Sequence, residues 1–166
     1  SPNNLLKPSD GGPVAVPSQD MVPGIYYLTQ DRPGANGEGK YFKSKNEAIL
    51  AYENGAVTLH SKIKVRVTRT MEDGTEMTGV IETTVGRILF NEIIPQDLGF
   101  VDRTIPGNEL KMEVDFLVKK KQLKQILEKV INTHGAMQTA ITLDDIKAIG
   151  YKFSTRAAMT VSVSDM

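Results

Sequence analysis

The chain has no cysteine and only two histidines among its 166 residues. Without cysteine there can be no disulfide scaffold, thiolate zinc site or cysteine nucleophile, a composition that fits a reducing compartment. His60 and His134 alone cannot form a histidine-rich metal site. No run of about 18 apolar residues occurs, and the N-terminus lacks the basic-then-apolar order of a signal peptide. We therefore expect a cytoplasmic protein with no membrane partner.

Charge of one sign is also lacking, because 20 Lys and Arg balance 20 Asp and Glu. No global positive field draws such a molecule to nucleic acid or anionic lipid, so any such contact must be local. Hydrophobic residues make up 40% of the chain, which suffices for one domain or two small lobes with a core. We predict an α+β lobe over residues 1–115 and a helical lobe over residues 116–166.

Proline and glycine are concentrated in residues 1–40, which predicts turns and extended chain. Within this stretch Ser18 can cap a short helix that runs to Tyr26 or Leu28. Pro23 would then lie near the fifth helical position, where it costs about 3 kcal/mol unless the helix starts later or opens with a 3-10 turn.

The middle of the chain changes from a helical to a strand pattern. Ser44 and Glu47 form a capping box, which predicts a helix from Ser44 to Asn54 that Gly55 stops. Alternating apolar residues from Ala56 predict a strand, and a turn at residues 72–74 followed by a polar arm over residues 77–84 predicts a hairpin. The apolar run over residues 87–94 fits a strand or a helix equally well. Residues 95–113 read as a loop.

Apolar residues at helical spacing return after residue 116. They predict one helix that Gly135 closes and a second over residues 137–158, with Gly150 as a point of kinking and an extended segment from Met159 to Val163. The expected fold class is α+β: an N-terminal loop and short helix, antiparallel strands with a hairpin, and a C-terminal helical lobe.

Side chains able to do acid–base chemistry are scattered along the chain. The carboxylates qualify only by residue type: Glu72, Asp73, Asp102, Asp115, Asp144 and Asp145. Neighbouring residues on a helix point in different directions, so Asp144 and Asp145 do not form a dyad. No nucleophile elbow and no metal-ligand spacing occurs, which argues against an autonomous hydrolase or metalloenzyme.

Two features could meet a phosphate. A basic patch lies at the expected start of a helix, formed by Lys119, Lys120, Lys121 and Lys124. Lysines in this position most often form a solvated helix face, which is the more common explanation of the patch. Arg156 lies near the end of a helix among small residues, so its guanidinium has room to reach an anion across a cleft.

Several strings in this order resemble the largest catalytic (beta-prime) subunit of bacterial DNA-directed RNA polymerase. The most specific are Val-Pro-Ser-Gln-Asp at residues 16–20 and Thr-Thr-Val-Gly-Arg at residues 83–87, and the others are Asn-Asn-Leu-Leu-Lys-Pro at 3–8, Gly-Ile-Tyr-Tyr-Leu-Thr at 24–29, Lys-Val-Arg-Val at 64–67, Gly-Tyr-Lys-Phe-Ser-Thr-Arg-Ala at 150–157 and Val-Ser-Val-Ser-Asp-Met at 161–166. The resemblance covers essentially the whole chain. Pro23 departs from it, since the family usually has an aliphatic residue there.

The resemblance implies a segment that follows the catalytic loop, shapes the pore beside the secondary channel and ends in the F-loop over residues 159–166. The aspartates that hold Mg²⁺ in that family lie outside this chain, so the segment alone should not be catalytic. The resemblance places Gln19 facing the active centre and Arg156 near the triphosphate of the incoming nucleotide. The implied partners are the remaining beta-prime segments, the beta and other polymerase subunits, nucleoside triphosphates, DNA and RNA.

A different class of function competes with this one. An autonomous protein-interaction module would bind another protein through the helical lobe and use the hairpin as a spacer. Such a module would fold as a monomer without a large exposed apolar patch, whereas a segment of a larger subunit would expose a former interface.

Overall fold

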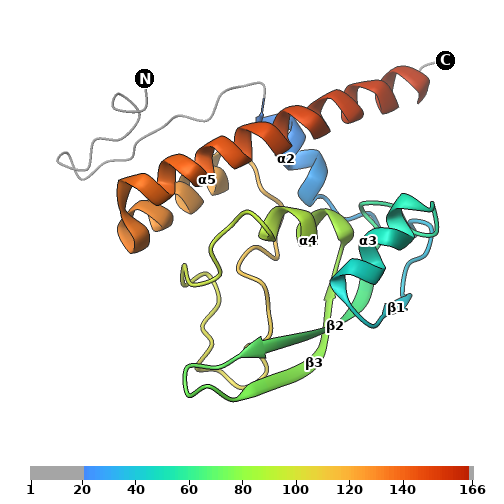
Figure 1. The fold of residues 1–166 in the computed structure, drawn as a ribbon. Helices are drawn as coiled ribbons and strands as arrows, with labels where there is room; N and C mark the ends of the chain where they lie inside the picture. The colour runs from blue at the N-terminus through green and yellow to red at the C-terminus, as the bar shows by residue number, and fades with distance from the viewer. Residues whose placement is uncertain (1–20, 165–166) are drawn as a thin grey trace.

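The structure is a computed structural model that describes residues 21–164, with side chains through residue 159. In chain order its elements are α2 (Val22–Thr29), β1 (Tyr41–Phe42), α3 (Lys45–Glu53), β2 (Ile63–Thr70), β3 (Glu76–Thr83), α4 (Val85–Asn91) and α5 (Lys120–Ser164). Figure 1 shows the sheet on the side of the molecule opposite α5, with α2 and α4 between them. This arrangement confirms the expected α+β class with helices after the strands.

The start of α2 removes the conflict over Pro23. The helix begins at Val22, so Pro23 stands within its first two positions. The N–H that proline lacks would have no partner inside the helix there, and its fixed φ suits a helix start. Met21 occupies the N-cap position without a side-chain hydrogen bond. The proposed cap, Ser18, lies outside the described residues.

Helix α3 forms where the capping box predicts it. The Ser44 hydroxyl accepts a hydrogen bond from the Glu47 amide at 3.0 Å, and the Glu47 carboxylate accepts one from the Lys43 amide at 3.0 Å. Gly55 follows with φ of 82°, the left-handed conformation that glycine adopts without a Cβ clash. Local hydrogen bonds therefore determine both ends of this helix.

The three strands lie in the order β1-β2-β3. β2 and β3 form the expected antiparallel hairpin, paired from Ile63 with Thr83 to Thr70 with Glu76, and β1 adds a short parallel pairing at Tyr41 and Phe42. The prediction that the strand begins near Ala56 is wrong, since β2 begins at Ile63. Before β2, side-chain hydroxyls accept hydrogen bonds from backbone amides that a strand would need for pairing. The Thr58 amide donates to Ser61 Oγ at 3.0 Å, and the His60 amide donates to Thr58 Oγ1 at 3.1 Å.

Most of the undecided apolar run over residues 87–94 belongs to the helix α4, which ends at Asn91. Thr84 caps it by accepting a hydrogen bond from the Arg87 amide at 3.2 Å. Nearly every residue of α4 is buried, including Val85, Ile88 and Phe90. A segment buried on all sides has no polar face, which is why periodicity could not separate a helix from a strand.

The loop after α4 has neither helix nor strand, as predicted for residues 95–113. Buried polar side chains hold it. Asn91 donates to the Val114 carbonyl at 2.8 Å and accepts from the Val114 amide at 3.0 Å. Glu113, only 1% exposed, accepts from the Phe100 amide at 2.8 Å and pairs with Arg103 at 3.3 Å.

Gly135 divides α5 into two helical parts, residues 120–134 and 136–164. Its φ of 86° and ψ of −178° are not helical, and Figure 1 shows the chain turning back there. This break confirms the predicted helix end at Gly135.

Two predictions within α5 are wrong. Gly135 is the interior position at which α5 departs from helical geometry, so Gly150 does not kink the helix. A Cβ at Gly150 would come within 2.7 Å of the Met21 Cβ, so the glycine serves close helix packing instead. The chain from Met159 to Val163 is helical rather than extended, because α5 continues to Ser164. The strand preference of β-branched residues is weak, and the preceding helix overrides it.

One hydrophobic core contains side chains from both sides of residue 115. It joins Ile25 and Leu28 of α2, Ile63 of β2 and Leu123 and Ile146 of α5. The division into lobes at residues 1–115 and 116–166 stays a prediction.

Candidate functional site

Arg156 lies on the exposed side of α5 and reaches another element of the fold. Its Nη1 donates a hydrogen bond of 2.8 Å to the hydroxyl of Tyr52, a residue of α3 that is 104 positions away in sequence. Its guanidinium carbon lies 5.0 Å from the ring centroid of Phe153, one helical turn earlier. Phe153 is only 2% exposed, so this ring is a firm support. A cation on an aromatic face gains electrostatic attraction, so both contacts limit where the guanidinium can lie.

A hollow of about 590 Å³ begins beside this pair, because Tyr52 also lines it. We call it the tyrosine hollow; its walls include Tyr27, Arg32, Tyr52, Val57 and His60. The Arg32 guanidinium lies 5.8 Å from the Tyr27 ring centroid and donates to Gln30 at 3.3 Å. Two guanidinium groups, Arg32 and Arg156, therefore adjoin aromatic side chains in this part of the surface. Such groups suit an anionic ligand, since each is planar, always charged and able to donate two parallel hydrogen bonds.

His60 has a structural role at the base of the tyrosine hollow. It is 3% exposed, its ring meets Tyr27 edge-on at 4.7 Å, and its Nε2 donates to the Tyr27 carbonyl at 2.7 Å. Desolvation lowers the pKa of His60, against the hydrogen bond to Tyr27 that raises it. The neutral ring with its proton on Nε2 satisfies this geometry. His134, the other histidine, pairs with Asp97 at 2.7 Å on the surface.

Arg87 forms the centre of a charged cluster that sequence reasoning did not find. The side chain is nearly buried, and its Nε donates to the Thr29 carbonyl at 2.9 Å. Asp31 and Asp115 approach its guanidinium at 3.9 and 3.6 Å, and Lys62 donates to Asp31 at 3.3 Å. The partners of Arg87 lie far away in sequence, so no local pattern announces the cluster.

The pKa values of the two carboxylates of this cluster are shifted in opposite directions. Burial raises the pKa of Asp31, but the hydrogen bond from Lys62 and the charge of Arg87 outweigh it and lower the pKa below its ordinary value. Desolvation raises the pKa of Asp115, although Arg87 opposes the shift. A guanidinium lies between the carboxylates, so they compensate a buried cation rather than share a proton.

The remaining candidate carboxylates do not converge. Asp73 and Asp102 each accept hydrogen bonds from a threonine two residues later, at Thr75 and Thr104. Asp144 and Asp145 are exposed on α5. Within residues 21–159 no group of three or more His, Asp or Glu side chains is placed to hold a metal ion. The described residues therefore do not fit a Mg²⁺ site.

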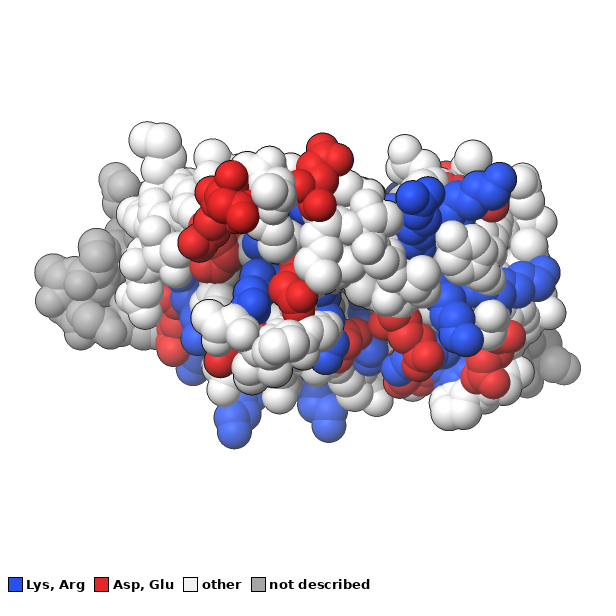
Figure 2. Space-filling view, turned by 90° about the horizontal axis from the view of Figure 1, so that it is seen from below, with Lys and Arg blue, Asp and Glu red and all other residues white. Residues whose placement is uncertain are grey.

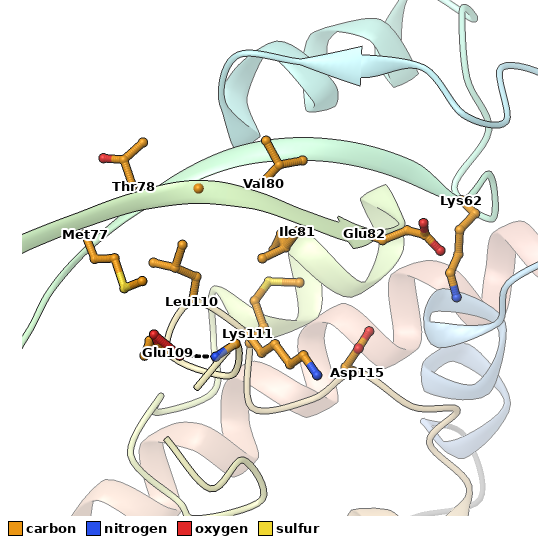
Figure 3. A pocket seen from close by; sticks show the side chains of 13 residues that line it. Lys62, Met77, Thr78, Val80, Ile81, Glu82, Glu109, Leu110, Lys111 and Asp115 are labelled. Carbon is orange, nitrogen blue, oxygen red and sulfur yellow. Dashed lines mark hydrogen bonds between the residues drawn. The ribbon is translucent and has the colours of Figure 1, made fainter. Parts of the chain in front are cut away.

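A second hollow, of about 400 Å³, lies between β3 and residues 107–115. Figure 3 shows Met77 and Ile81 pointing from β3 toward Leu110, whereas Thr78 and Val80 point to the other side of the strand. Lys62, Lys111 and Asp115 lie at one end of it. This hollow joins an apolar middle to a charged end, and Arg156 is not among the described residues that line it.

The other candidate residues from the sequence are Gln19 and the four lysines of the basic patch. Gln19 lies outside the described residues. Lys119, Lys120, Lys121 and Lys124 are exposed at the start of α5. Figure 2 shows Lys and Arg interspersed with Asp and Glu over the face seen from below, in line with a formal net charge of zero. Tyr52 falls within the helix predicted from Ser44 to Asn54, and its contact with Arg156 had no sequence signal because it joins distant residues.

Comparison with known proteins shows the class of protein to which the chain belongs. Residues 4–166 match the family described as RNA polymerase Rpb1, domain 3, so the chain is of the RNA polymerase large-subunit class. It belongs to the Rpb1 domain 3 family, as the resemblance in the sequence indicated. No helix among residues 21–164 is long and apolar enough to cross a membrane.

The curated relatives are bacterial. The chain is 72% identical over its full length to the DNA-directed RNA polymerase subunit beta' of Lachnoclostridium phytofermentans and covers 13% of that protein. It is 60% identical to the corresponding subunit of Acetivibrio thermocellus, again over its full length, and covers 14% of it. Identity to the subunit of Clostridium novyi is 56% over 164 residues. The chain therefore spans about one seventh of the length of these relatives.

Proposed function

We propose that this chain works as a segment of the beta' subunit of a bacterial DNA-directed RNA polymerase. There it shapes the active-centre pore and secondary channel and positions the incoming nucleotide during transcription. The observation that carries the proposal is the 72% identity to a beta' subunit over every residue of the chain. The autonomous interaction module gains no support, because the relatives carry this sequence within a much longer subunit.

Arg156 is the residue we assign to the triphosphate of the incoming nucleotide. Its side chain is exposed, permanently charged and supported by Phe153 and Tyr52. A guanidinium next to a triphosphate offsets the negative charge and helps to align the α-phosphate for in-line attack. Gln19 remains the proposed residue facing the active centre.

The rest of the machinery is proposed to come from outside this chain. Mg²⁺ would be held by carboxylates elsewhere in the beta' subunit, so the chain alone is not catalytic. The proposed partners are the other beta' segments, the beta and remaining polymerase subunits, nucleoside triphosphates, DNA and RNA. A cytoplasmic location belongs to the same proposal.

A segment exchange tests the proposal as a whole. The matching 13% of the Lachnoclostridium phytofermentans subunit would be replaced with this chain and the assembled polymerase assayed for transcription. We expect a chimeric enzyme that assembles and extends RNA. Assembly without any RNA extension would contradict the proposed role, provided that the same exchange with the natural segment restores activity.

Arg156→Ala in the intact polymerase tests the assigned residue. We expect a higher apparent KM for nucleotide or a lower kcat, equivalent to about 1 to 3 kcal/mol of lost transition-state stabilisation. Steady-state kinetics of single-nucleotide addition would measure this loss. Unchanged kinetics would remove Arg156 from the site.

A further inference from the structure

One contact of the Arg156 guanidinium reaches α3. Figure 1 shows α3 beside the sheet, whereas Arg156 belongs to the long C-terminal part of α5. The 2.8 Å hydrogen bond between Arg156 Nη1 and the Tyr52 hydroxyl joins these two elements. The bond therefore links a residue assigned to the nucleotide with a helix that has no assigned role in nucleotide addition.

Two of the contacts that Arg156 makes restrict different motions. Phe153 lies on the same helix and is buried, so its ring keeps the guanidinium near one face of α5. A ring face tolerates rotation of the planar group above it, because the attraction depends mainly on distance. A hydrogen bond from Nη1 is directional and selects one orientation of the plane. Tyr52 therefore supplies the orientation that Phe153 does not.

Orientation matters for the chemistry assigned to Arg156. Bidentate recognition of a phosphate uses two N–H groups of one guanidinium edge, so the plane must face the ligand before the ligand arrives. A long arginine side chain otherwise loses rotamer freedom when it binds, and that loss weakens affinity. Preorganisation by a tyrosine hydroxyl reduces this cost.

Tyr52 is itself placed by local structure. It lies in the last turn of α3, whose start is capped by Ser44, and its ring is partly buried at the wall of the tyrosine hollow. The end of α3 therefore fixes the position of the Tyr52 hydroxyl, and α5 brings Arg156 to it.

We propose that Tyr52 is a positioning residue for nucleotide addition, which acts by orienting the Arg156 guanidinium toward the triphosphate. This inference rests on the proposed function of Arg156. It adds a residue from α3 to the determinants of nucleotide affinity and assigns to it no contact with the nucleotide.

The test uses the intact polymerase with Tyr52→Phe, which removes the hydroxyl and keeps the ring. We expect the apparent KM for nucleoside triphosphate to rise about threefold to tenfold, the range for one typical lost hydrogen bond, with a smaller change in kcat. Tyr41→Phe is the matched control, because Tyr41 is 50% exposed on β1 and the structure shows no hydrogen bond from its hydroxyl among residues 21–159. It should leave KM unchanged.

The double variant Tyr52→Phe with Arg156→Ala separates positioning from a purely structural role. If Tyr52 acts through Arg156, removing its hydroxyl should add nothing once the guanidinium is gone. Effects that add, or a Tyr52→Phe enzyme with normal KM beside an impaired Arg156→Ala enzyme, would overturn this inference and leave the proposed function standing. Normal kinetics in Arg156→Ala would overturn both.

Discussion

The place where α2 crosses α5 differs from the β2–β3 hairpin in how closely its atoms are packed. At the crossing, the backbones meet directly: a Cβ on Gly24 would overlap the carbonyl oxygen of Gly150, and one on Gly150 would press on Met21. In the hairpin, burial fades along the strands, from fully buried Ile63 at one end to exposed Thr70 at the other. Figure 1 shows the hairpin on the side of the molecule opposite α5.

This difference shows where the molecule tolerates change. The crossing has no spare volume, because interiors are packed as densely as crystals and the nearest atoms are backbone. The hairpin is held by its ladder of hydrogen bonds and by surface pairs, with one face in water. Mutations at the crossing should therefore be costly, and mutations at the hairpin tip should be mild.

The largest expected effect comes from Gly24→Ala. The new methyl group would collide with the backbone of α5 at Gly150 and Ser154, so α2 must move away and core contacts open. We expect a loss of about 3 kcal/mol in the free energy of unfolding, at the upper end for an overpacked core, measured by urea denaturation.

Gly74→Ala in the hairpin turn is the matched control. It adds the same methyl group in open space, at a φ of 87°. The cost should be about 1 to 2 kcal/mol from the left-handed conformation alone. Equal losses in the two variants would contradict the view that the crossing lacks room.

The next effect depends on pH and concerns His60, which contacts Tyr27 of α2. Desolvation lowers the pKa of His60 below the ordinary value of 6.5, so the unfolded chain binds a proton more readily than the folded one. Stability from the neutral ring is present above pH 6.5 and is lost as the pH falls toward the folded pKa. The slope can reach about 1.4 kcal/mol per pH unit.

Thermal unfolding between about pH 5 and 7 would measure this slope, in the range where histidines titrate. His60→Gln should be less stable than the wild type at pH 7 and less sensitive to acid. An identical pH slope in both proteins would show that the buried ring does not govern acid sensitivity in this range.

The smallest effect is expected on the hairpin surface. Thr68 and Thr78 share a hydrogen bond of 2.9 Å between their hydroxyl groups, both on the exposed face of the strands. Thr78→Ala should cost less than about 1 kcal/mol, as for other cross-strand pairs. A loss as large as that of Gly24→Ala, in the same denaturation assay, would mean that the hairpin is part of the rigid core.

Much of the local structure could be predicted from the sequence. The Ser44 cap, the hairpin turn at Gly74 and the helix end at Gly135 all rest on contacts between near neighbours. The family was also visible, because its motifs are strings of adjacent residues, and Arg156 was named from one of them. The expectation of a kink at Gly150 failed because the reason for that glycine is Met21, on the other side of the core.

Only some residues of the candidate site could be predicted from the sequence. Sequence reasoning named Arg156 but not Tyr52, and it named Asp115 without its neighbour Arg87. Helix α4 was undecided because burial on every side removes the polar face on which periodicity depends.

The sequence by itself therefore determined helix ends, turns and family, since these depend on hydrogen bonds and backbone preferences within a few residues. Only the tertiary structure decided that Gly24 meets Gly150, that Arg87 lies between Asp31 and Asp115, and that Tyr52 holds Arg156. Contacts between residues far apart form only when the whole core packs, because burial of apolar side chains, rather than any local pattern, brings their elements together.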